Sequence, residues 1–206
     1  MFCCTYKAGS WQNPRIIPYG PISLDPSAKV FHYGQAVFEG MKAFKDKHGD
    51  IHLFRPDQNI TRMNKSCQRL AIPEFPEDLF LQALKTLIDL DREWVIDGHG
   101  HALYIRPVVF ATEYGVAASP SEGYEFMIIL SPVTAYYNEK LKVVIADHYS
   151  RAANGGVGFT KAAGNYAAQF YPTHLAREKG YHQVIWTDAN THEFLEEAGT
   201  MNVFFR

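Results

Sequence analysis

An unbroken run of five apolar residues, Phe126 to Leu130, most strongly limits what this chain can fold into. The run has the length of a strand, in which successive side chains point to opposite faces. A strand that is apolar on both faces must be covered on both faces. We therefore expect a doubly buried strand within 124–134, and further strand-like segments lie at 101–112 and 142–147.

The segment before this strand reads as a hairpin followed by two helices. Strands at 40–47 and 51–54 flank a turn. Pro56 suits the first turn of a helix, and apolar residues then recur at helical spacing. A second helix begins near Pro76, where an acidic first turn complements the helix dipole. The proline-rich first 30 residues, in contrast, predict irregular, extended chain.

After the apolar run the pattern changes to a loop of small residues at 152–158. A helix is predicted from about Asn165 to Lys179, ending at Gly180, a residue favoured after helix C-termini. Pro172 lies inside this helix, so we expect a kink or break there. Short strands are expected at 183–187, 192–196 and 201–205.

This order of elements is that of an α+β chain. We expect a small N-terminal α/β domain over 1–138, an interdomain linker over 139–151, and the start of a larger second domain over 152–206. The last segment, about 55 residues, is marginal for a core of its own. The chain also stops on apolar Phe204 and Phe205 with no capping turn, so the second domain is expected to be truncated.

Charge and cysteine content narrow the possible functions. Lys plus Arg (20) nearly balance Asp plus Glu (22), so neither a nucleic acid partner nor a membrane partner is expected. No apolar run approaches the ~18 residues of a membrane span, and the start lacks the pattern of a signal peptide. Cys3, Cys4 and Cys67 predict reduced thiols in a cytoplasmic protein. The nine histidines are scattered, and no metal site is expected.

Lys161, placed among small residues in 155–168, is the strongest candidate for chemistry. A neutral lysine amine forms Schiff bases with carbonyl compounds, and desolvation favours the neutral form. The glycine spacing does not match a P-loop. Taken by itself, however, the segment also fits a flexible surface loop with a solvated lysine.

Each of the other candidate residues, taken alone, allows both a functional and a structural interpretation. The acidic pair 196–197 could hold a protonated ring nitrogen or form a charged turn. Arg62 could reach an anion or be solvated. On a strand, Tyr104 and Arg106 share a face and could hold a carboxylate, but a structural ion pair fits as well. The aromatic residues of 30–44 could line a pocket or fill the core.

Five separated motifs carry a resemblance along almost the whole chain, from about Trp11 to Phe205. They are His32-Tyr33 with 38–42, then 53–56, 104–107, Lys161 with 164–166, and Glu197 with 199–202. Together and in this order they resemble the branched-chain-amino-acid aminotransferases, which belong to the fold-type IV class of pyridoxal-phosphate enzymes. The shared order is far more specific than any single motif.

The resemblance implies a cofactor, pyridoxal 5′-phosphate, and a role for each matching residue. Lys161 is expected to form the Schiff base and to move a proton between the substrate Cα and cofactor C4′. Glu197 would keep the pyridine nitrogen protonated. Tyr166 would hydrogen-bond the ring 3-oxygen, Arg62 would hold the phosphate, and Thr200 would lie near the cofactor.

The resemblance also implies the substrates, which are amino acids and 2-oxo acids. The expected reaction is reversible ping-pong transfer of the amino group between L-leucine, L-isoleucine or L-valine and 2-oxoglutarate. The aromatic residues expected to line the pocket are Tyr33, Phe38, Tyr104 and Tyr136. Arg106 and Tyr33 would help to hold the α-carboxylate. Val116 would reach the pocket of a neighbouring subunit. The resemblance suggests a homodimer in which the partner's Tyr33 and Val116 regions complete each pocket.

Two alternatives stay open. The first is another fold-type IV enzyme, such as a D-amino-acid aminotransferase or an aminodeoxychorismate lyase, which would use a lysine and a glutamate in the roles expected for Lys161 and Glu197. The motifs at 38–42 and 104–107 favour the branched-chain enzyme. Members of the resembled family also continue well beyond the point that matches Phe205. The chain could therefore be a fragment, and a non-catalytic fragment is the second alternative.

Overall fold

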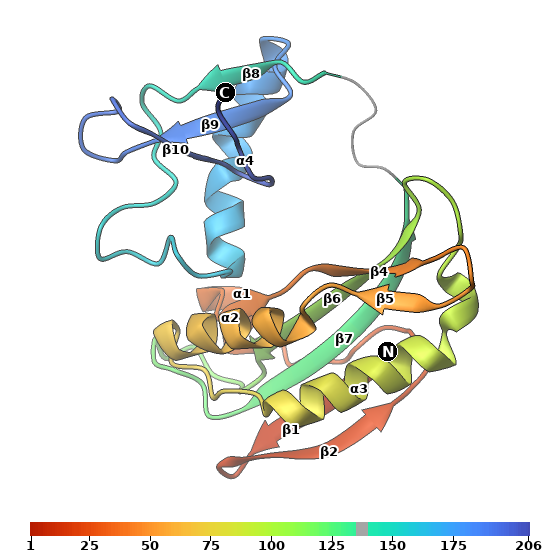
Figure 1. The fold of residues 1–206 in the computed structure, drawn as a ribbon. Coiled ribbons are helices and arrows are strands. Elements are labelled where there is room, and N and C mark those ends of the chain that lie inside the picture. Colours follow the sequence, from red (N-terminus) through yellow and green to blue (C-terminus); the bar gives the residue numbers. More distant parts are fainter. Residues whose placement is uncertain (135–139) are drawn as a thin grey trace. The chain divides into compact units, whose positions relative to one another are not determined.

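The computed structural model describes residues 1–134 and 140–206, which form two compact units (Figure 1). The first unit comprises 1–134 together with Thr160–Ala163, and the second comprises 140–159 and 164–206. Each unit has its own β-sheet. The prediction of an α+β chain is confirmed.

An antiparallel sheet forms the first unit, with the order β2-β1-β7-β6-β4-β5 and β3 paired to β6 in the described part of the chain. Its strands are β1 (Phe2–Lys7), β2 (Ser10–Ile16), β3 (Ala36–Phe38), β4 (Met41–Lys45), β5 (Ile51–Leu53), β6 (Ala102–Ala111) and β7 (Tyr124–Val133). β7 lies between β1 and β6. Phe126 and Ile128 belong to the main core, whereas Met127 belongs to a second apolar cluster. The predicted doubly buried strand is thus confirmed.

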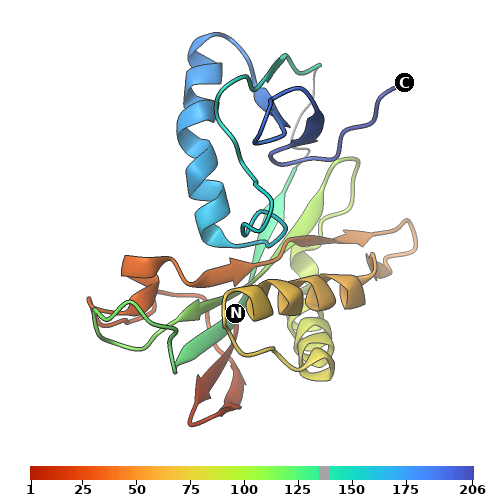
Figure 2. The ribbon, with the colours of Figure 1, turned by 90° about the vertical axis from the view of Figure 1, so that its left-hand side faces the viewer.

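Two amphipathic helices cover the main core. α2 (Pro56–Arg69) and α3 (Glu77–Leu90) lie side by side against the sheet (Figure 2). The apolar stripe of α2 buries Ile60, Met63 and Cys67, and that of α3 buries Leu84 and Leu87. Both helices start at the predicted prolines. The short α1 (Lys29–Tyr33) and a 3-10 turn, η1 (Arg92–Trp94), complete the unit and were not predicted.

The prediction of an irregular first 30 residues is wrong for 2–16, where β1 and β2 form a hairpin, whereas 17–27 contain no regular helix or strand. Pro14 lies inside β2, which is an edge strand, and its neighbour Asn13 has a positive φ of 55°. The register of the pair shifts between Cys3 and Thr5, opposite this part of β2. A bulge in an edge strand tolerates a residue without an N–H donor, so proline does not prevent pairing.

In the second unit, a smaller sheet with the order β10-β9-β8 packs with α4 (Ala163–Glu178). β8 (Val143–Ile145) and β9 (Gln183–Thr187) are parallel, and β10 (Leu195–Ala198) is antiparallel to β9. Val184, Trp186 and Ala176 form its core. β8 falls inside the range predicted as a linker, 139–151, so this part of that range is paired within the second unit.

Two expected features of the second unit do not occur. α4 continues through Pro172, so the expected break is absent there. The proline removes only the helical hydrogen bond to the carbonyl of Ala168, while burial of Ala176 against Val184 and Trp186 holds the same helix in place. Residues 201–205 form no strand, although their pattern is apolar.

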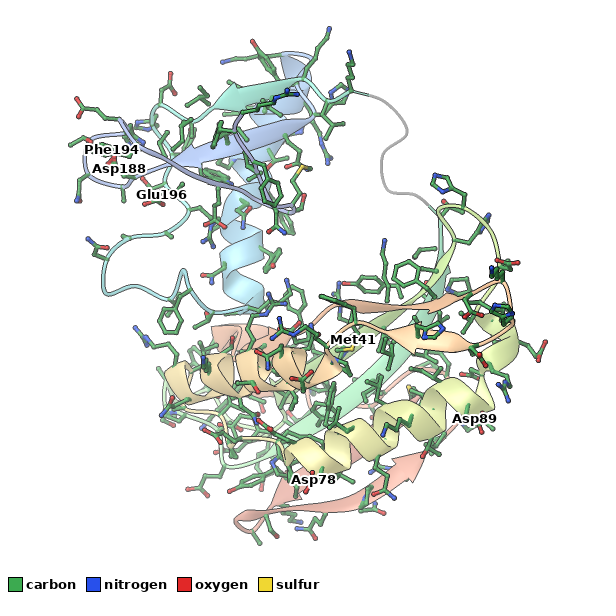
Figure 3. All side chains as sticks on the ribbon, in the orientation of Figure 1. Met41, Asp78, Asp89, Asp188, Phe194 and Glu196 are labelled. Carbon is green, nitrogen blue, oxygen red and sulfur yellow. The ribbon has the colours of Figure 1, made fainter. Side chains whose placement is uncertain are left out.

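The last strand begins later than predicted because Asp188 organises the turn before it. Its carboxylate accepts hydrogen bonds from the backbone N–H groups of Thr191, His192, Glu193 and Phe194. Those bonds lower the pKa of Asp188 well below its usual value. Figure 3 shows Asp188 and Phe194 together at this end of β9 and β10. The turn therefore occupies residues that the pattern assigned to a strand.

No helix in the described ranges, 1–134 and 140–206, is long and apolar enough to cross a membrane.

Candidate functional site

Lys161 is held in place through its backbone. Its N–H donates to Ser66 Oγ of α2 at 3.0 Å, and its carbonyl oxygen accepts from the N–H of Phe38 at 3.1 Å. The next residue, Ala162, is buried and bridges to Val37 of β3. Main-chain and hydroxyl contacts from two elements thus anchor this segment, in contrast to the flexible loop that its composition also allowed.

The Lys161 side chain lies in a cluster of residues that the sequence had singled out separately. Its Nζ is 5.0 Å from the centre of the Phe38 ring, and the Arg106 guanidinium carbon is 4.5 Å from the same centre. Arg106 Nη2 also donates to the Tyr104 hydroxyl at 2.8 Å. The Lys161 amine and the Arg106 guanidinium therefore both lie close to one aromatic ring. The strand geometry of β6 places Tyr104 and Arg106 on one face, as predicted.

This cluster is suited to bind an anion. Arg106 Nε is buried and has no hydrogen-bond partner in the described part of the chain. Buried polar groups in proteins are normally paired, so such an N–H indicates a missing acceptor. A carboxylate is the acceptor that a guanidinium binds most strongly. Gly40 keeps the cluster open, because a Cβ there would collide with the Tyr104 hydroxyl.

Arg62 is oriented by Glu39, a residue that was not predicted as part of the site. Arg62 Nε and Nη2 contact the two carboxylate oxygens of Glu39 at 2.6 and 2.8 Å. Glu39 is fully buried and also accepts from Asn59 Nδ2 and the Gly40 N–H. The Arg62 side chain, in contrast, is 54% exposed. Glu39 thus fixes one edge of a guanidinium that solvent can reach.

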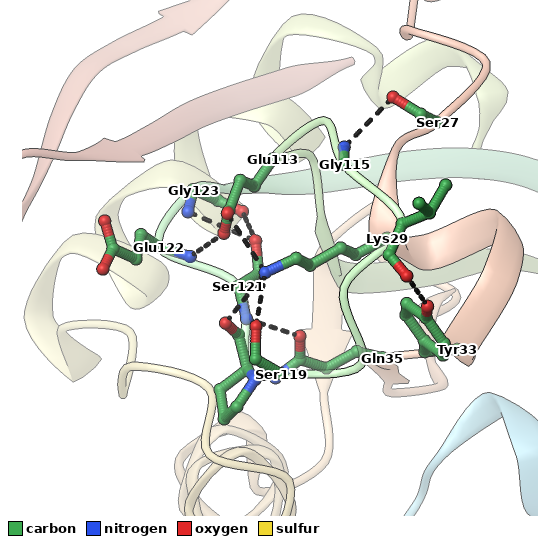
Figure 4. Close-up of polar contacts among 12 residues, drawn as sticks. Ser27, Lys29, Tyr33, Gln35, Glu113, Gly115, Ser119, Ser121, Glu122 and Gly123 are labelled. Carbon is green, nitrogen blue, oxygen red and sulfur yellow. Dashed lines mark hydrogen bonds and ion pairs between the residues drawn. The ribbon is translucent and has the colours of Figure 1, made fainter.

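Tyr33 and Val116, both expected at a subunit boundary, lie together in a second group of the first unit. The Tyr33 hydroxyl donates to the carbonyl oxygen of Val116 (Figure 4). Tyr33 is on α1, and Val116 is in the loop that follows β6. Both side chains are exposed, to 44% and 71%.

The second unit carries the remaining candidates. Glu197 of β10 pairs with Arg151, whose Nε is 2.6 Å from Glu197 Oε1, and Arg151 also donates to the Gly158 carbonyl. The Arg151 side chain is only 11% exposed. Sequence reasoning missed Arg151, since an isolated arginine beside a loop carries no motif. Thr200 Oγ1 accepts from Gln183 Nε2 at 3.2 Å.

Two candidates remain, Tyr166 and Tyr136. Tyr166 lies in the first turn of α4 and is half-buried. Tyr136 lies outside the described residues.

The cysteines and metal ligands offer no competing site in the described residues. Burial raises the pKa of Cys67 to about 12, so its thiol is protonated at neutral pH. Cys3 and Cys4 are also buried, and burial raises their pKa values. No group of three or more His, Cys, Asp or Glu side chains that could hold a metal ion occurs in 1–134 and 140–206. Lys161 therefore remains the principal candidate nucleophile.

The family model and the similar proteins point to the same family of enzymes. The amino-transferase class IV family matches residues 36–206. "Branched-chain-amino-acid transaminase 1" of Bacillus subtilis is 50% identical over 210 residues, covering 100% of this chain and 59% of that protein. A "probable branched-chain-amino-acid aminotransferase" of Staphylococcus aureus is 49% identical over 199 residues, covering 95% and 55%. The chain thus spans less than two thirds of the length of these relatives.

Solved structures show the same fold. The branched-chain amino acid aminotransferase of Escherichia coli has a TM-score of 0.75 at 21% identity, covering 96% of this chain and 62% of that one. The branched-chain amino acid aminotransferase of Thermobaculum terrenum, in its PLP-form, has a TM-score of 0.71 at 21% identity, covering 96% and 61%. At these identities the likeness establishes the fold, and the fold-type IV prediction is confirmed.

Proposed function

The chain belongs to the amino-transferase class IV family, and from this we propose that it is part of a branched-chain-amino-acid transaminase. The proposed reaction is reversible transfer of an amino group between L-leucine, L-isoleucine or L-valine and 2-oxoglutarate. The observation that carries the proposal is the cluster around the Phe38 ring, where the amine of Lys161 and the guanidinium of Arg106 meet. It combines a nucleophile with a carboxylate-binding group.

The residues fit pyridoxal 5′-phosphate, which supplies an aldehyde for amino groups and an electron-withdrawing ring. Arg62, oriented by buried Glu39, offers a cation for the phosphate. The carboxylate of Glu197, which contacts Arg151, suits a protonated ring nitrogen. Tyr166 and Thr200 would complete the set of contacts to the ring and phosphate.

Lys161 has two proposed roles. Its neutral amine is the nucleophile, and it carries a proton to and from the substrate Cα. Both roles need a side chain with a defined starting point, and the backbone bonds to Ser66 and Phe38 provide one. With the backbone of Lys161 held by α2 and β3, its amine lies within 5.0 Å of the centre of the Phe38 ring, which Arg106 also contacts.

Arg106 and the aromatic residues are proposed to select the substrate. The buried Nε of Arg106 would donate to a substrate carboxylate, and the rings of Phe38 and Tyr104 would pack against the side chain. A pocket distinguishes one methylene by only about 1–3 kcal/mol. The three branched amino acids should therefore all be accepted.

An assay of the complete protein tests the substrate class. With 2-oxoglutarate as acceptor, we expect L-leucine, L-isoleucine and L-valine to be converted with kcat/KM values within about two orders of magnitude of each other. L-alanine and D-alanine serve as matched controls and should react far more slowly. Activity confined to D-alanine would overturn this proposal in favour of a D-amino-acid aminotransferase.

We also propose that the complete protein is a homodimer in which Tyr33 and Val116 face the partner's pocket. Their exposed side chains, together with those of Phe31 and Tyr114 at 62% and 75%, form an apolar surface around α1 and the loop after β6. Size-exclusion chromatography with light scattering should give twice the chain mass. A fully active monomer would contradict the proposal.

A further inference from the structure

A buried lysine outside the Lys161 cluster joins α1 to the loop that carries Val116. Lys29, the first residue of α1, is only 3% exposed. Its Nζ lies 3.0 Å from Glu113 Oε1, 3.0 Å from Ser119 Oγ and 3.2 Å from the Pro120 carbonyl (Figure 4). A buried ammonium is expensive unless it is paired and hydrogen-bonded, and these three acceptors meet that need. All of them belong to the loop after β6.

The second carboxylate oxygen of Glu113 links the start of the same loop to its end. Glu113 Oε2 accepts from the backbone N–H of Glu122 at 2.6 Å. That bond, together with the contact from Lys29, lowers the pKa of Glu113, so its carboxylate is charged at neutral pH. One ion pair therefore ties the start of the loop to its end and to α1.

The middle of the loop is attached to the neighbourhood of α1 by three further contacts. The Gly115 N–H donates to the carbonyl oxygen of Ser27 at 3.1 Å and to Ser27 Oγ at 3.0 Å. The Tyr33 hydroxyl donates to the carbonyl of Val116. The two residues expected to complete a neighbouring pocket are thus presented by a single hydrogen-bonded assembly with Lys29 at its centre.

We propose that Lys29 is a positioning residue for substrate binding. It touches no substrate, but it sets the place of Val116 and of the Tyr33 hydroxyl, and through them the affinity of the pocket. The inference rests on the proposed function, because that function gives Tyr33 and Val116 their role. A methionine of similar length would fill the same space without a charge or a donor, so packing alone does not require a lysine here.

Lys29→Met in the complete protein is the test, with Lys85→Met, an exposed lysine on α3, as the matched control. We expect faster amide hydrogen exchange at Gly115 and Glu122 and a roughly tenfold higher KM for L-leucine, since small displacements of positioning groups have large effects. The kcat and the visible absorption of the bound cofactor should change little. The control should alter none of these values.

A double-mutant cycle separates positioning from general destabilisation. If Lys29 acts through the Tyr33–Val116 contact, Tyr33→Phe should raise the KM less in the Lys29→Met background than in the wild type. Additive effects would overturn the proposal. Should Lys29→Met fail to fold, Ser119→Ala removes one of the three contacts and should show the same changes on a smaller scale.

The outcomes distinguish this inference from the proposed function. Unchanged exchange at Gly115 and Glu122, or faster exchange with an unchanged KM, would overturn the role of Lys29 while leaving a working transaminase. A wild-type protein without transaminase activity would instead refute the proposed function, and the role of Lys29 in substrate binding would be refuted with it.

Discussion

Replacing Lys161 with alanine is expected to lower kcat by at least about 10³-fold, because the change removes the side chain proposed as both nucleophile and proton carrier. The fold should survive, since Lys161 contacts Ser66 and Phe38 through backbone atoms that alanine retains. The measurement is kcat with L-leucine and 2-oxoglutarate. Borohydride reduction followed by peptide mapping should find the cofactor attached to the peptide that contains Lys161, and only in the wild type.

Lys179→Ala is the matched control, because Lys179 is exposed just after the end of α4. It should leave kcat and the attachment site unchanged. If Lys161→Ala kept activity within about tenfold of the wild type, or if the cofactor were mapped to another lysine, the assignment of Lys161 would be wrong.

Arg62→Ala is expected to destabilise the cofactor-free protein by about 3 kcal/mol, because it leaves the fully buried carboxylate of Glu39 without its cation. Asn59 and the Gly40 N–H continue to donate to Glu39. The expected loss of unfolding free energy therefore lies at the lower end of the range for a broken buried ion pair. Adding Glu39→Gln to Arg62→Ala should restore part of the stability by removing the unpaired charge. Urea denaturation without cofactor measures this, so that cofactor binding does not contribute.

Arg92→Ala provides the comparison for a surface pair. Arg92 contacts Asp89 at 3.4 Å, with both side chains more than half exposed. Exposed pairs contribute about 0–1 kcal/mol, so this variant should unfold almost like the wild type. If Arg62→Ala were no more destabilised than Arg92→Ala, the buried pair with Glu39 would not contribute as argued.

Much of the fold was predictable where local patterns and packing agree. The apolar run at 126–130 lies in β7 because a central strand needs apolar side chains on both faces. The proline starts of α2 and α3 follow from local chemistry. The hairpin of β1 and β2 was missed because the bulge that accommodates Pro14 depends on an edge position, which only strand pairing creates.

The sequence by itself determined the family and the candidate residues for the proposed chemistry, because nucleophiles, cations and rings occur in an order shared with that family. Only the tertiary structure decided their partners. Glu39 meets Arg62 from 23 residues away, Arg151 meets Glu197 from 46, and Lys29 meets Ser119 from 90. The physical reason is that a charge is stabilised by whatever donor or acceptor the fold brings within hydrogen-bonding distance, and local sequence does not contain that partner.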